Sequence, residues 1–187
     1  MPLIIDQQNP GPFSRTDSAV ANPGGPAITV GQSATPLFSA IDAMEFYLRP
    51  SSLFPSTTAM VQLRDGLVGS DGLGGLILAA SGSVTLPAGS PEGFYRFEFP
   101  HRALTPLQTY VAELVVTEGG LDLGTNQDNP YAGGQSLSKG LPSFILAPTT
   151  DQVFREGVYA VSVPVPGAVL LGMLGLGFAG LRLRRVS

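Results

Sequence analysis

The sequence has no cysteine, no tryptophan, a single histidine and few charged residues. Without cysteine the chain cannot form disulfides, thiolate nucleophiles or cysteine-ligated zinc sites. With His101 as the only histidine, a transition-metal centre would lack its usual ligands. Charged residues make up 13% of the 187 residues, against about 25% in a typical soluble domain. Serine, threonine, glycine and proline therefore supply much of the polarity.

The few charges are unevenly distributed along the chain. All fourteen acidic residues precede residue 157, whereas three of the ten basic residues are Arg182, Arg184 and Arg185. Seven basic residues are left to balance the acidic residues, so the body has a formal charge of −7. Nucleic-acid binding requires basic patches, so an acidic body predicts no nucleic-acid partner.

The motifs of the common enzyme classes are also missing. There is no Gly-x-Ser-x-Gly sequence and no phosphate-binding loop. Ser136-Leu137-Ser138-Lys139 matches the Ser-x-x-Lys pattern, but that motif needs the start of a helix, and here it lies in a glycine-rich stretch. We predict that the protein is not an enzyme and has no catalytic or cofactor-binding residues.

The body, residues 1–160, is predicted to be all-β. The 24 glycines and 17 prolines divide the chain into short apolar segments, which is typical of an antiparallel β-sandwich with jelly-roll-like topology. Alternation is clearest in Phe94–Pro100 and in Tyr110–Glu118, whereas 17–26 and 122–140 are predicted to be loops. The first and last strands of jelly rolls often pair, so we expect 3–7 to lie beside 153–161.

Three polar residues of the glycine-rich stretch are candidate calcium ligands: Asp122, Asn126 and Asp128. Calcium takes oxygen ligands from irregular loops, although this spacing is not that of an EF-hand. The alternative is that these side chains are solvated and cap turns. A structural calcium ion is the only cofactor that the sequence suggests.

A second candidate is a carbohydrate platform made of aromatic rings. The available rings outside obvious core positions are Tyr47, Phe94, Tyr95, Tyr131 and Tyr159. Strand alternation assigns most of them to packing, which is the competing interpretation.

The C-terminal segment, residues 161–187, is different in character. Gly167–Leu181 contains no charged residue and has no polar face, which excludes an amphipathic helix on a soluble protein. Four glycines inside it, at positions 172, 175, 177 and 180, disfavour a buried core helix, at about 1 kcal/mol each relative to alanine. The twenty residues from Pro164 to Leu183 suffice to cross a bilayer. Arg182, Arg184 and Arg185 would then keep the C-terminus in the cytoplasm.

This order of parts resembles the PEP-CTERM sorting signals of Gram-negative bacteria, in which Pro-Glu-Pro precedes a short transmembrane helix and an arginine cluster. The matching residues are Pro164, Val165 and Pro166, the apolar segment, and the arginines. Val165 departs from the family, because it replaces the glutamate. The resemblance implies processing by an exosortase, a membrane-embedded cysteine transpeptidase, and delivery to the cell surface.

The body is also similar to domains found upstream of such tails, at Leu104-Thr105-Pro106-Leu107, Tyr131-Ala132-Gly133-Gly134 and Phe154-Arg155-Glu156-Gly157. In that family the first of these segments is Leu-Thr-Pro-Gly, and no activity transfers with the resemblance. We therefore expect an exported protein, anchored in the inner membrane in transit, with a structural or adhesive role in the envelope or extracellular matrix.

Other functions are compatible with the same sequence, and export requires a signal sequence. The same tail could display a carbohydrate- or calcium-dependent binding module, with an extracellular polysaccharide as partner, or the chain could self-associate. The N-terminal residues MPLIIDQQNPGPF contain neither a basic region nor an apolar run of signal-peptide length. An export signal is therefore expected outside this sequence.

Overall fold

The computed structural model describes residues 1–10, 15–21, 29–66, 75–127, 131–140, 143–147 and 150–160. Within these ranges the chain forms strands and no helix. The strands are β1 (Leu3–Asn9), β2 (Arg15–Val20), β3 (Val30–Ala34), β4 (Ala40–Pro50), β5 (Ser56–Asp65), β6 (Ile77–Ala80), β7 (Val84–Pro87), β8 (Gly93–Ala103), β9 (Tyr110–Glu118), β10 (Gly120–Gln127), β11 (Ser136–Gly140), β12 (Ser143–Ala147), β13 (Thr150–Gln152) and β14 (Phe154–Tyr159).

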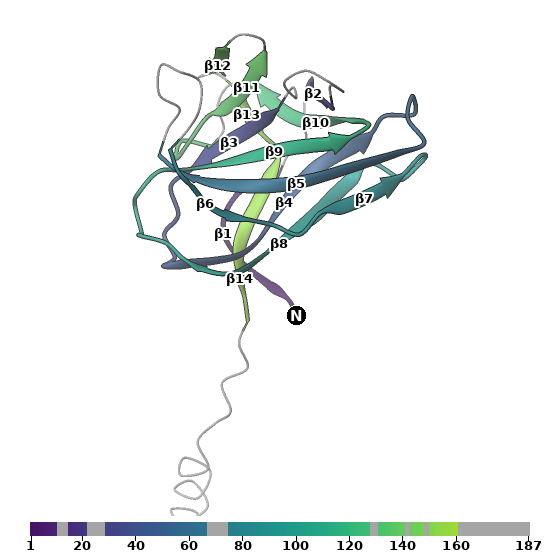
Figure 1. Cartoon of the computed structure of the whole chain (residues 1–187). Helices are drawn as coiled ribbons and strands as arrows, with labels where there is room; N and C mark the ends of the chain where they lie inside the picture. Colours follow the sequence, from purple (N-terminus) through teal and green to yellow (C-terminus); the bar gives the residue numbers. More distant parts are fainter. Residues whose placement is uncertain are drawn as a thin grey trace, which may run out of the picture.

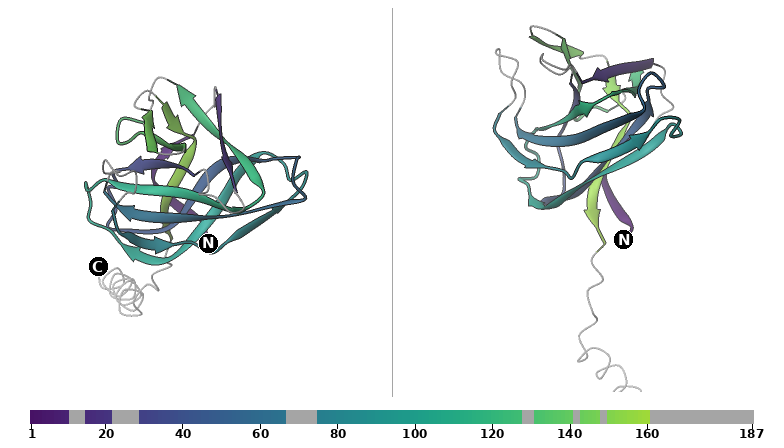
Figure 2. Two further views of the ribbon diagram at one scale, coloured as in Figure 1. Left: turned by 45° about the horizontal axis from the view of Figure 1, so that its top comes forward. Right: turned by 45° about the vertical axis from the view of Figure 1, so that its right-hand side comes forward.

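The strands form two sheets that pack against each other (Figures 1 and 2). Sheet I has the order β1-β14-β4-β10-β13, with β8 beside β4 and β2 beside β10. Sheet II has the order β12-β11-β3-β9-β5-β6, with β7 beside β5. All of these pairings are antiparallel. The prediction of an all-β antiparallel sandwich is therefore confirmed.

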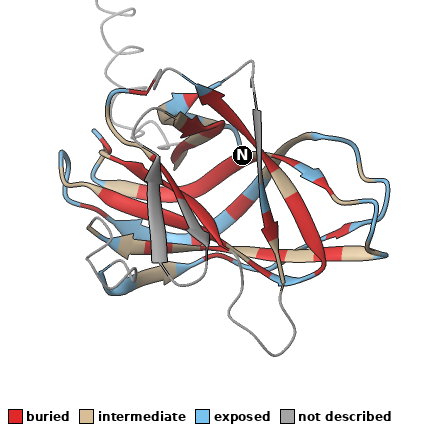
Figure 3. Cartoon of the chain, turned by 90° about the horizontal axis from the view of Figure 1, so that it is seen from above, coloured by how far each residue is buried: buried red, intermediate tan, exposed pale blue. Residues whose placement is uncertain are grey.

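The core lies between the two sheets and follows the predicted alternation. In β8, Phe97 and Phe99 are buried, whereas Arg96 and Glu98 on the opposite face are exposed. The corresponding inward residues of β9 are also buried: Tyr110, Ala112, Leu114 and Val116. In this strand Val111 and Glu113 on the other face are buried too. Figure 3 shows buried residues along the strands of both layers and exposed residues mainly at the connecting loops. Alternation works here because each sheet has one face against the other sheet.

Two segments predicted to be loops contain strands instead. The polar stretch 122–140 includes most of β10 and all of β11, and 17–26 overlaps β2. The loop prediction was wrong because pairing decides the conformation here: β10 pairs with β2, β4 and β13. Ladder hydrogen bonds from several neighbours outweigh the weak strand propensity of glycine and aspartate.

The first and last strands of the body lie side by side, as predicted. β1 pairs antiparallel with β14 from Leu3↔Tyr159 to Asn9↔Phe154. Figure 1 and the right-hand view of Figure 2 show the N-terminus beside the end of β14. Residues 161–187, which contain the predicted tail, lie outside the described residues. The described chain ends at Ala160, whose backbone N–H donates to the carbonyl of Pro2 at 3.2 Å.

The corner between β8 and β9 contains a leucine in a conformation that favours glycine. Leu107 has a φ of 66°, and among the described residues it is the only non-glycine residue with positive φ. Its backbone N–H donates to the carbonyl of Pro36 at 2.8 Å, which fixes the corner against the loop before β4. A leucine in the left-handed region costs about 1–2 kcal/mol, so the corner stores strain.

Replacing Leu107 with glycine is expected to raise the free energy of unfolding by about 0.5–1 kcal/mol, because strain relief exceeds the added entropy of the unfolded chain. Leu107→Val should lower it, because a β-branched residue tolerates positive φ poorly. Urea denaturation measures both, with Leu53→Gly in another exposed turn as the control. Equal losses of stability in Leu107→Gly and Leu53→Gly would show that the corner is unstrained.

Candidate functional site

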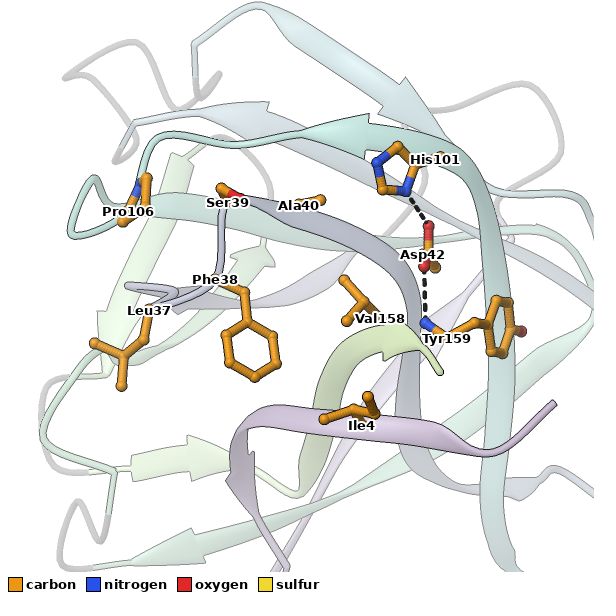
Figure 4. A pocket seen from close by; sticks show the side chains of 10 residues that line it. All are labelled: Ile4, Leu37, Phe38, Ser39, Ala40, Asp42, His101, Pro106, Val158 and Tyr159. Carbon is orange, nitrogen blue, oxygen red and sulfur yellow. Dashed lines mark hydrogen bonds and ion pairs between the residues drawn. The ribbon is translucent and has the colours of Figure 1, made fainter. Parts of the chain in front are cut away.

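One candidate site is an open groove at the end of the sandwich where β14 stops. It has a volume of about 650 Å³ and lies between β1, β14 and the loops that precede β4 and follow β8. Its apolar wall consists of Ile4, Leu37, Phe38 and Val158 (Figure 4). The groove therefore sits beside the point where residues 161–187 begin.

A buried aspartate forms the polar wall of this groove. Asp42 lies in β4 where the pairing register with β8 shifts, and its Oδ1 is 2.6 Å from Nδ1 of His101. Its Oδ2 accepts a hydrogen bond from the backbone N–H of Tyr159 at 2.7 Å. Figure 4 shows both contacts. Asp42 of β4 thus links the last residue of β14 to His101 of β8, two strands that both pair with β4.

Chemically, Asp42 and His101 resemble two members of a catalytic triad, because a carboxylate orients the histidine through Nδ1. The third member would be a hydroxyl in reach of Nε2. Ser39 also lines the groove, but Figure 4 places it on the far side of Ala40 from the histidine ring, with no hydrogen bond to it. The His101 side chain is mostly exposed. In the described part of the chain, no hydroxyl is hydrogen-bonded to the His101 ring, whose contact is with Asp42.

The opposite rim of the groove is held by a second aspartate. Oδ2 of Asp6 accepts hydrogen bonds from the backbone N–H groups of Leu37 and Phe38, at 2.9 and 2.8 Å. Asp6 lies in β1 at a register shift of the β1–β14 pairing. The loop before β4 is therefore tied to the first strand, and the groove has a defined shape.

A buried polar network, which the sequence analysis did not anticipate, lies where β13 meets β3 and β11. The Asp151 carboxylate is fully buried and accepts hydrogen bonds from Nε2 of Gln32 and the backbone N–H of Tyr131, both at 2.9 Å. Oε1 of Gln32 accepts from the backbone N–H of Gln152 at 2.7 Å, and the Gln152 amide donates to Ser136 at 2.8 Å. Burial raises the pKa of Asp151, while the hydrogen bonds from Tyr131 and Gln32 lower it.

Tyr131 packs against the two glycines that follow it in the chain, Gly133 and Gly134. Its ring packs edge-to-face on Phe154, with 5.1 Å between the centroids, and its hydroxyl accepts from the backbone N–H of Thr35 at 3.1 Å. A Cβ on Gly133 would lie 2.5 Å from that hydroxyl, so only glycine fits there. Burial raises the pKa of Tyr131 to about 12. The Tyr-Ala-Gly-Gly segment therefore wraps a buried ring.

Glu156 is another buried carboxyl group. It projects inward from β14 on the same face as Phe154, and it is 4% exposed. Its Oε1 has no hydrogen-bond partner in the described structure. Burial, and to a lesser extent the negative charge of Asp6, raise the pKa of Glu156 to about 8. The side chain is therefore mostly protonated at neutral pH.

The aromatic rings considered for a carbohydrate platform are mostly engaged with neighbouring side chains. Phe94 meets Tyr47 edge-to-face at 5.4 Å, and the guanidinium of Arg155 lies 3.9 Å from the Phe94 centroid. Arg96 lies 5.9 Å from the Tyr159 centroid. These residues cover the outer face of sheet I, and carbohydrate binding stays a prediction.

Two of the three candidate calcium ligands lie on β10, four residues apart. That spacing is about 13 Å in a strand. Asp122 pairs with Arg49 at 2.8 Å and accepts from Ser18 at 2.7 Å, whereas the Asn126 amide donates to Asn9 at 2.9 Å. Asp128 lies outside the described residues. In the described part of the chain, no three His, Cys, Asp or Glu residues form a group that could hold a metal ion.

Ser136 is buried at the start of β11 and does not begin a helix. The sorting residues Pro164, Val165 and Pro166, and the arginines Arg182, Arg184 and Arg185, lie outside the described residues.

Comparison with known proteins assigns no family to the chain. No family model matches it, and no curated protein is similar enough to be matched. In the ranges that the structure describes, the chain has no apolar helix of membrane-spanning length.

Proposed function

We propose that this protein is an exported β-sandwich, anchored in the membrane in transit by residues 161–187 and then displayed at the cell surface or in the extracellular matrix. Its role there is structural or adhesive. The observation that carries the proposal is the tail sequence: a proline pair, an uncharged segment and three arginines follow directly on the last strand. Its partners would be the membrane, an exosortase-type enzyme and extracellular polysaccharide.

Two features of the body support this assignment. β14 ends beside β1, so the tail would leave from one end of the sandwich without disturbing a sheet. The chain also crosses between sheets repeatedly, from β3 to β4 to β5 and from β8 to β9 to β10. These crossings support a jelly-roll-like description, which is common among displayed domains.

A non-catalytic role is supported by the way the polar groups are used. Ser136 is buried and accepts a hydrogen bond from Gln152, and the Asp42–His101 pair links strands at the groove. We therefore propose that the protein acts by binding or packing.

An alternative function is a displayed binding module for carbohydrate or calcium. The aromatic and charged outer face of sheet I favours this reading, because rings and guanidinium groups lie together there. A glycan array, and melting with and without calcium, would detect it.

Self-association is a further candidate. Two large apolar residues are exposed at the edge strand β6: Leu76 directly before it and Ile77 within it.

Cell fractionation tests the main proposal. The full-length protein should appear in the membrane fraction, and its processed form at the surface. Intact protein with an uncleaved tail in the soluble cytosol would contradict the proposal.

Restoring the glutamate of the sorting motif should increase processing. In a host that contains an exosortase, Val165→Glu is expected to raise the cleaved fraction several-fold, because it recreates Pro-Glu-Pro. Val163→Glu is the matched control, since it adds the same charge outside the proline pair. Intact mass spectrometry gives the cleaved fraction; equal processing of both variants and the unmodified protein would argue against this sorting pathway.

A further inference from the structure

Exposed apolar side chains gather at the end of the sandwich from which the tail departs. Seven large apolar residues of the described chain are exposed, and four of them can be placed at this end. Ile4 (47% exposed) and Leu37 (60%) line the groove. Leu107 (73%) is held beside it by the hydrogen bond to Pro36, and Met1 (87%) lies at the N-terminus next to the end of β14 (Figure 1). We call these four residues the apolar rim. Singly exposed apolar residues are ordinary, but a cluster marks an interaction surface.

The rim is held in place by the fold. The backbone N–H of Leu37 donates to Asp6, and the backbone N–H of Leu107 donates to the carbonyl of Pro36. Leu107 also keeps an exposed apolar side chain at a strained backbone position. A strained backbone conformation persists only where the surrounding structure holds it in place. Such conformations are concentrated at functional sites. Behind the rim lies the groove lined by Phe38 and Val158 (Figure 4).

The length of the connection to the tail limits how far the rim can be from a membrane. Three residues separate Ala160 from Pro164, where the twenty-residue apolar segment begins. A fully extended chain of this length spans about 14 Å, and the polar layer on one side of a bilayer is about 5–7 Å thick. With the tail inserted, Ala160 must therefore lie within about 10 Å of the lipid headgroups.

We propose that the apolar rim rests on the surface of the phospholipid bilayer while the tail is inserted. The rim side chains would enter the headgroup layer, and the groove would face the lipid. Arg102 is exposed in β8 next to His101 and would contact lipid phosphates. This inference rests on the proposed function, because it requires an inserted tail. It adds an orientation: the long axis of β14 points toward the membrane, and the turn that contains Leu53 points away.

The absence of cysteine makes a direct test simple. Single-cysteine variants of the full-length protein, Leu37→Cys, Leu107→Cys and Leu53→Cys, are labelled with an environment-sensitive dye and reconstituted in phosphatidylcholine vesicles. Leu53 is the matched control, because it is exposed in the turn at the far end of β4. A Leu176→Cys variant reports on the tail. Quenching is then measured with spin labels placed at the lipid headgroup or deep in the acyl chain.

We expect the headgroup label to quench the dyes at positions 37 and 107 several-fold more than the dye at 53, and the deep label to quench position 176. Deep quenching at 176 with equal quenching at 37, 107 and 53 would overturn the inference and leave the proposed anchor standing. No quenching at 176 would contradict the anchor and the inference together. A concentration-dependent blue shift at 37 and 107 without lipid quenching would assign the rim to a second copy of the chain, which also overturns the inference.

Discussion

Replacing Glu156 with glutamine is expected to stabilise the protein at pH 8 by a few kcal/mol and to flatten its dependence of stability on pH. Burial raises the pKa of Glu156 from 4.5 to about 8, so between these values the folded state holds a proton that the unfolded state releases. The contribution of Glu156 to the free energy of unfolding is therefore greatest below pH 4.5 and is lost as the pH rises through 8. The slope approaches about 1.4 kcal/mol for each pH unit.

Glutamine keeps the shape of the neutral acid and cannot ionise. Its cost should be small, because Oε1 of Glu156 has no hydrogen-bond partner to lose. Thermal or urea unfolding of both proteins from pH 4 to pH 9 measures the effect. Glu118→Gln is the matched control, since Glu118 is exposed at the end of β9. Parallel stability curves for Glu156→Gln and the unmodified protein would mean that Glu156 does not hold a proton in the fold.

Some pH dependence should remain in the Glu156→Gln variant. Burial also raises the pKa of Asp151, and this carboxyl group contributes with the same sign. The remaining slope should be smaller, because hydrogen bonds from Tyr131 and Gln32 favour the ionised form of Asp151.

Replacing Asp151 with asparagine is expected to destabilise the fold by about 1–3 kcal/mol, although the two side chains have nearly the same shape. Both Asp151 oxygens accept hydrogen bonds, from Gln32 and from Tyr131. Asparagine can satisfy one of these donors and presents an N–H group to the other. Gln32 cannot flip its amide to compensate, because its Oε1 accepts from the backbone of Gln152.

A loss of this size is a large part of the 5–15 kcal/mol that holds a typical domain together. Urea denaturation measures it, and a double-mutant cycle with Gln32→Ala tests the mechanism. The Asp151→Asn penalty should shrink when Gln32 is already alanine, because the opposing donor is gone. Additive penalties in the cycle would show that the two side chains are not coupled.

The amino-acid pattern predicts much of the sandwich without any structure. Phe97 and Phe99 face inward because alternation and a two-layer fold leave no other arrangement. The pairing of β1 with β14 follows in the same way from the expected topology. These features are visible in sequence because each depends on residues that are close together in the chain or on a general rule of the fold class.

The polar interior could not be found in this way. Gln32 and Asp151 are 119 positions apart and meet only because β3 and β13 pack together. Asp122 was a candidate calcium ligand by its neighbours in sequence, and the fold places Arg49 beside it. Composition and periodicity therefore determined the fold class, and the tail sequence alone suggests where the protein goes. Only the tertiary structure decided which carboxyl groups are buried, because burial and partners come from strands distant in sequence.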